Sequence, residues 1–77
     1  MTPEESGIMK DAFFFLRDHD NPPANGVLGC EQYWAQAARQ ITELGRKWNH
    51  HPLVLEVLPA IYGYLETRSR QKAGDAP

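Results

Sequence analysis

Apolar residues recur at intervals of three and four along most of the chain, a spacing that predicts α-helices. The first helix begins at Thr2, because Thr2 and Glu5 have capping-box spacing and Pro3 fills the first helical position. It ends within residues 18–25, where Asp-His-Asp-Asn-Pro-Pro cannot continue a helix. Its apolar face consists of two adjacent rows, Ile8, Ala12, Phe15 and His19, and Met9, Phe13 and Leu16.

Two further helices follow a loop over residues 20–29 that is rich in proline, glycine and asparagine. The second runs from about Glu31 to Trp48, and the third runs from Pro52 to about Arg70. Pro59 lies inside the third helix, where its ring displaces the Leu55 carbonyl, so we expect a bend there. The inward positions of these two helices are Trp34, Ile41, Leu44, Trp48, Val54, Leu58, Ile61 and Leu65.

The pattern therefore predicts a small all-α domain of three helices over residues 1–70. The second and third helices form an antiparallel hairpin, since a short connection favours antiparallel neighbours. Residues 71–77 are expected to form a flexible tail.

Size and composition limit what this domain can be. A core in fewer than about 80 residues supplies only about 3–5 kcal/mol, and the single cysteine, Cys30, excludes an internal disulfide. The chain must therefore pack very well, bind a metal, or associate with a partner or a second copy. No apolar run approaches the ~18 residues of a membrane span, and the acidic start lacks the basic residues of a signal peptide. We expect a cytoplasmic protein without a membrane contact, and its net charge of −2 argues against nucleic-acid binding.

Three consecutive phenylalanines indicate a contact surface. Side chains of adjacent helical residues point about 100° apart, so Phe13, Phe14 and Phe15 cannot all face one core. We predict a partner-binding patch centred on Phe14, with Tyr33 or Tyr62 nearby. In the alternative, Val27 and Leu28 of the 20–29 loop fold over Phe14 within the monomer.

The corner between the second and third helices carries the most conspicuous motif. Trp48-Asn49-His50-His51-Pro52 resembles the His-His-Pro signature of pterin-4a-carbinolamine dehydratases, in which the histidines serve acid–base chemistry. That family continues into β-strands and a later His-Asp pair, and this chain has neither, so we reject the assignment. In the structural interpretation, Asn49 adopts a left-handed conformation, His51 caps and Pro52 begins the third helix.

Metal binding is a further hypothesis for the histidines. His19, between Asp18 and Asp20, ends the first helix, and His50 and His51 end the second. Zinc or nickel could bind if those two helix ends met. The sequence otherwise predicts no cofactor.

The second half of the chain resembles a class of short uncharacterised helical proteins encoded in prophages and mobile elements of Firmicutes. The resemblance rests on Tyr33-Trp34, Asn49-His50-His51-Pro52-Leu53, Ala60-Ile61-Tyr62 and Tyr64-Leu65-Glu66. It implies a cytoplasmic accessory protein that binds a protein partner without catalysis, and inhibitors of host systems such as CRISPR defence are one subset. The alternative is a small His-based enzyme or a metal-binding protein.

Overall fold

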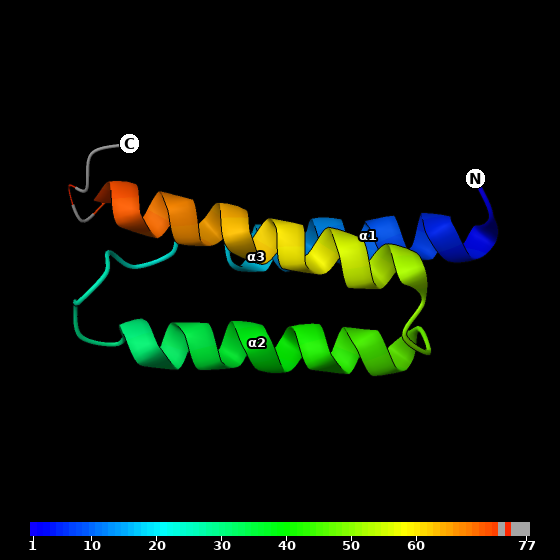
Figure 1. Ribbon diagram of the computed structural model, residues 1–77, viewed down its shortest axis with the longest axis horizontal. Coiled ribbons are helices and arrows are strands. Elements are labelled where there is room, and N and C mark those ends of the chain that lie inside the picture. Colours follow the sequence, from blue (N-terminus) through cyan, green and yellow to red (C-terminus); the bar gives the residue numbers. More distant parts are fainter. Residues whose placement is uncertain (73, 75–77) are drawn as a thin grey trace.

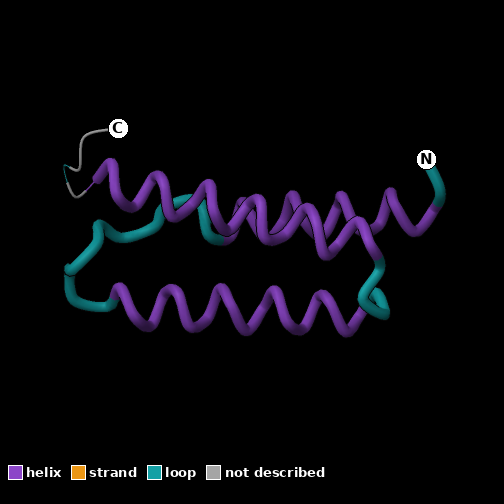
Figure 2. The backbone as a smooth tube through the Cα atoms, in the orientation of Figure 1, coloured by secondary structure: helices purple, strands orange, loops and turns teal. Residues whose placement is uncertain are grey.

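The computed structural model describes residues 1–72 and 74, which form three α-helices (Figure 1). The helices are α1 (Pro3–Asp18), α2 (Cys30–Lys47) and α3 (Pro52–Lys72). Figure 2 shows only helices and loops in this part of the chain, which confirms the all-α prediction. None of these helices is long and apolar enough to cross a membrane.

α3 is the central helix of the bundle, because both α1 and α2 pack along it. α1 and α3 run in the same direction and α2 runs in the opposite one, so α2 and α3 form the expected antiparallel hairpin (Figure 1). α3 continues through Pro59 and reaches Lys72, and thus includes two residues that we expected in the tail. Residues 73 and 75–77 of that predicted tail lie outside the described residues.

The capping box at the start of α1 is formed as the sequence predicts. The Glu5 N–H donates to Thr2 Oγ1 at 3.1 Å, and the Thr2 N–H donates to Glu5 Oε1 at 2.6 Å. These bonds with Thr2 lower the pKa of the Glu5 carboxyl. The cap satisfies two backbone donors that the first turn of a helix leaves unpaired.

The core lies mainly between α1 and α3. The first predicted row of α1 is buried along its whole length, and α3 contributes Val54, Leu58 and Leu65. From α2, only Ala37 is a fully buried apolar side chain. Five of the inward positions expected for α2 and α3 are half-buried against this core, namely Trp34, Ile41, Leu44, Trp48 and Ile61.

The connection between α1 and α2 covers the carboxyl-terminal part of α3, beyond the end of α1 (Figure 1). Pro22 is buried there, and Ser69 Oγ lies 2.6 Å from the Pro23 carbonyl oxygen and 3.0 Å from Asn25 Oδ1. Lys72 Nζ donates to the Pro22 carbonyl at 2.7 Å. The loop thus packs against the last turns of α3, beyond the point where α1 ends. It also provides hydrogen-bond acceptors for the buried Ser69 hydroxyl.

At the opposite end of the bundle, Trp48 joins α2 to α1. Its Nε1–H donates to Asp11 Oδ2 at 2.9 Å, and Lys47 Nζ donates to the same oxygen at 2.8 Å. The indole also lies directly on Gly7, where an added Cβ would be 2.6 Å from Trp48 Cη2. A side chain at this position would therefore displace the indole from the backbone of α1.

The Asp11 carboxylate is expected to make folding sensitive to acid. Partial burial raises its pKa, but the hydrogen bonds from Lys47 and Trp48 outweigh burial and leave the pKa below its ordinary value. A depressed folded pKa means that this stabilisation is complete above the unfolded pKa of about 4. It is lost as the pH falls through the folded pKa.

Urea unfolding between about pH 7 and about pH 2 tests this expectation. Asp11→Asn should be less stable than the wild type at neutral pH, and the two proteins should converge at the acid end. A stability difference that stays constant over this range would contradict a role for Asp11 ionisation.

Candidate functional site

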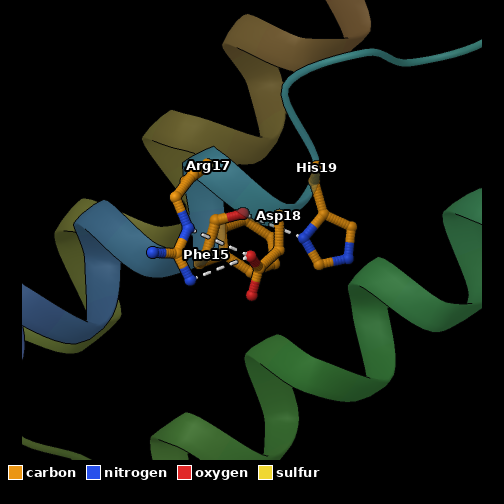
Figure 3. A network of polar contacts seen from close by, with 4 residues as sticks. All are labelled: Phe15, Arg17, Asp18 and His19. Atoms are coloured by element: carbon orange, nitrogen blue, oxygen red, sulfur yellow. Dashed lines mark hydrogen bonds and ion pairs between the residues drawn. The ribbon is translucent and has the colours of Figure 1, made fainter.

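His19 is a buried structural residue at the end of α1. Its Nδ1 donates to the Phe15 carbonyl at 2.9 Å, and its ring lies on the Phe15 ring with centroids 4.6 Å apart (Figure 3). The Tyr33 hydroxyl of α2 donates to the His19 carbonyl oxygen. Burial raises the pKa of the Tyr33 hydroxyl. Through the hydrogen bond from Tyr33, His19 therefore holds the end of α1 against the beginning of α2.

His50 and His51 form the corner between α2 and α3. Asn49 and His50 both have left-handed backbone conformations, with φ of 56° and 55°, and the His50 N–H donates to the Gly45 carbonyl at 2.7 Å. His51 Nδ1 accepts a hydrogen bond of 3.1 Å from the Leu53 N–H in the first turn of α3. The left-handed Asn49, the His51 cap and the start of α3 at Pro52 all agree with the structural interpretation.

The metal hypothesis for the three histidines is wrong in its geometry. His19 lies beside Tyr33 at the beginning of α2, whereas His50 and His51 follow the end of that helix. The antiparallel course of α2 separates these ends by the length of the helix (Figure 1). Within residues 1–72 and 74, no three histidine, cysteine, aspartate or glutamate side chains are placed to hold a metal ion.

Removing the His51 cap should cost about 1 kcal/mol in the free energy of unfolding. His51→Ala leaves the Leu53 N–H without its acceptor, whereas His51→Asn keeps a side-chain acceptor at the cap. Chemical denaturation of both variants measures the difference. Equal stability of the two would mean that the cap contributes nothing.

The residues of the predicted partner-binding patch belong to two different groups of aromatic contacts. Tyr33 and Tyr62 belong to a cluster around Trp34, with ring centroids 4.7 Å and 5.1 Å from the Trp34 ring, and both tyrosines are half-buried. Phe14 lies instead against Phe13, at 5.7 Å, and under the Arg17 guanidinium, at 4.6 Å. No aromatic pair among the residues that the structure describes joins Phe14 to either tyrosine, and that these residues bind a partner stays a prediction.

The alternative, in which Val27 and Leu28 of the loop fold over Phe14, is wrong for Leu28. Leu28 is 103% exposed, so its side chain covers no other residue, and Val27 is 47% exposed. The reason is that the preceding loop residues are held against α3 by Ser69 and Lys72. Phe14 is half-buried and contacts Phe13 and Arg17 of its own helix.

The most exposed of the three phenylalanines is Phe13, and it lines a hollow between α1 and α3. We call this hollow the α1–α3 groove; its lining residues are Phe13, Leu16, Arg17, Asp20, Tyr64 and Arg68. It encloses about 290 Å³. Phe13 is 63% exposed on the α1 wall and Tyr64 is 54% exposed on the α3 wall. Met9, which is 43% exposed, precedes Phe13 by one turn on the same face.

Sequence reasoning missed this groove although its signal was present. Met9, Phe13 and Leu16 form a row beside the buried row of α1, and such a row is expected to widen the core stripe. Here α3 packs against the first row and leaves the second one partly open, so that Met9 and Phe13 are exposed and Leu16 is half-buried.

Two arginines line the α1–α3 groove, and one of them is already paired with a carboxylate outside it. Arg17 pairs with Asp18 at 3.3 Å, and this pair is exposed to solvent, with side chains 59% and 50% accessible. Figure 3 shows the contact between the Arg17 guanidinium and the Asp18 carboxylate. The half-buried Arg68 lies over the Tyr64 ring at 6.0 Å and forms no ion pair with any residue that the structure describes. Asp20 is the one carboxylate among the lining residues.

A second apolar hollow, of about 340 Å³, lies between α2 and α3. Its lining residues are Ala38, Ile41, Thr42, Pro59 and Tyr62. Its aromatic residue, Tyr62, is half-buried against Trp34, so this hollow offers less free aromatic surface than the α1–α3 groove.

Comparison with known proteins assigns no relative: no protein-family model, no curated protein and no solved structure matches the chain.

Proposed function

We propose that this chain is a non-catalytic accessory protein that binds a protein partner through the α1–α3 groove. The observation that carries the proposal is the pair of exposed aromatic side chains on facing walls, Phe13 on α1 and Tyr64 on α3. Exposed apolar surface of this kind is costly in water unless a partner covers it. Aromatic residues with neighbouring arginines are also the side chains that contribute most to protein interfaces.

A non-catalytic role is supported by what the histidines do. His19 Nδ1 is bonded to a backbone carbonyl, and His51 Nδ1 accepts a backbone N–H. Both rings thus stabilise helix ends. The alternative, a small His-based enzyme or metal-binding protein, draws no support from the residues that the structure describes.

The proposed origin in a mobile element rests on the sequence resemblance alone. Its likeness to helical proteins of Firmicute prophages supports a cytoplasmic accessory role in a mobile element. The partner would then be a host or phage protein, and an inhibitory effect on a host system such as CRISPR defence is one form of that role.

The test is quantitative capture of partner proteins from an extract of the native host with wild-type protein, Phe13→Ser and Leu28→Ser. Leu28 is the matched control, because it is fully exposed but lies outside the groove. We expect Phe13→Ser to reduce capture about tenfold or more, with its melting temperature unchanged, and Leu28→Ser to retain capture. Equal capture by wild type and Phe13→Ser would overturn the proposal.

A further inference from the structure

The Asn25-Gly26 dipeptide lies in an exposed turn of the loop between α1 and α2. Residues 24–27 form a β-turn, closed by the Val27 N–H, which donates to the Ala24 carbonyl at 3.3 Å. Gly26 has a left-handed φ of 86°, and a Cβ added to it would meet nothing within 4 Å. Its N–H forms no hydrogen bond with any residue that the structure describes. The Gly26 nitrogen is therefore both unhindered and free of a hydrogen-bond acceptor.

A free N–H directly after an asparagine permits deamidation of that asparagine. The Gly26 nitrogen loses its proton and attacks Asn25 Cγ; the new N–C bond closes a succinimide ring, and the side-chain nitrogen leaves as ammonia. Water then adds to one of the two ring carbonyl carbons and breaks the bond from that carbon to nitrogen. Opening at Cγ gives aspartate, and opening at the main-chain carbonyl carbon gives isoaspartate, in which the chain continues through the side chain. Water is the only co-reactant.

The other two asparagines of the chain lack this free N–H. Asn21 precedes Pro22, whose nitrogen carries no proton. Asn49 precedes His50, whose N–H donates to the Gly45 carbonyl at 2.7 Å. The fold thus leaves the succinimide route open at Asn25 alone.

Isoaspartate at position 25 is incompatible with the contacts that the turn now makes. Asn25 Oδ1 lies 3.0 Å from Ser69 Oγ on α3, while the Val27 N–H closes the turn on Ala24. Isoaspartate lengthens the main chain of the turn by one carbon atom and attaches the carboxylate directly to Cα. The longer main chain and the shorter side chain cannot keep both contacts at once.

We propose that Asn25 is a site of spontaneous deamidation, and that its conversion to isoaspartate opens the turn of residues 24–27 against α3. The reaction is a slow covalent modification of the loop that needs no enzyme. It is independent of the α1–α3 groove and of the proposed function.

The experiment is incubation of the folded, full-length protein in mildly alkaline buffer, followed by digestion and mass spectrometry. Deamidation raises the mass of a peptide by about one dalton, and electron-transfer fragmentation distinguishes isoaspartate from aspartate. The reference is the same chain unfolded in guanidinium, in which no asparagine is protected. We expect Asn25 to react in the folded protein within about fivefold of its rate in the unfolded chain, and Asn49 to react at least about tenfold more slowly when folded.

Hydrogen exchange before and after incubation measures the effect on the turn. The Val27 amide should exchange at least about tenfold faster in the isoaspartate form. Asn25→Ser, which lacks the side-chain amide, is the matched control and should exchange at the same rate before and after incubation.

Two results would overturn the inference. A rate at Asn25 that is more than about fivefold lower in the folded protein than in the unfolded chain would show that the turn protects the asparagine. Isoaspartate at position 25 with unchanged exchange of the Val27 amide would show that the modification leaves the turn closed.

Discussion

Replacement of Trp48 by alanine is expected to lower the free energy of unfolding by about 3–5 kcal/mol and to abolish cooperative melting. The indole fills the space between the end of α2 and Gly7 of α1, and its Nε1–H is bonded to Asp11. Trp48→Ala removes both the packing and the hydrogen bond. A domain of this size has only about 3–5 kcal/mol to lose.

Circular dichroism during heating and urea titration measures the effect. Gly7→Ala is a second probe of the same contact, because its new methyl group would lie 2.6 Å from Trp48 Cη2 and must displace the indole. Leu28→Ala, at a fully exposed position, is the control and should melt like the wild type. A Trp48→Ala protein that keeps a cooperative transition within about 1 kcal/mol of wild type would show that this contact does not hold α2 to α1.

Phe15→Ala should also cost about 3–5 kcal/mol, whereas Phe13→Ala should change stability by no more than about 0.5 kcal/mol. The two residues have the same side chain and lie two positions apart on α1. Phe15 is 1% exposed and packs on the His19 ring, and Phe13 is 63% exposed. Burial alone therefore accounts for the expected difference.

Chemical denaturation of the two variants, with far-ultraviolet circular dichroism as the readout, gives both values. Because the residues share one helix and one side-chain type, the comparison cancels the change in helix propensity. Comparable losses in the two variants would mean that Phe13 belongs to the core, and the α1–α3 groove would then not be a free surface.

The helices and their ends could be predicted because their signals are local. The capping box of Thr2 and Glu5, the left-handed Asn49, the cap at His51 and Pro52 at the start of α3 depend on backbone groups only a few residues away. Such interactions form wherever the sequence pattern occurs in a chain that folds. The buried row of α1 was predictable for the same reason, since helical periodicity alone places its side chains together.

The candidate site could not be predicted to the same extent. Periodicity places Phe13 and Phe14 on different faces of α1, but it does not say which of these faces another helix covers. We expected Phe14 to be the exposed residue, and Arg17 and Phe13 cover part of it instead. The path of the 20–29 loop depends on Ser69 and Lys72, more than forty positions further along the chain.

The amino-acid sequence by itself thus determined the number of helices, their ends to within about two residues, the corner at His50 and His51 and the inward row of α1. Only the tertiary structure decided that α3 is central, that Trp48 lies on Gly7 and that the histidines occupy opposite ends of the bundle. It also decided which apolar row remains open as the α1–α3 groove. The physical reason is that backbone hydrogen bonds and caps act between near neighbours, whereas burial depends on which distant surfaces meet.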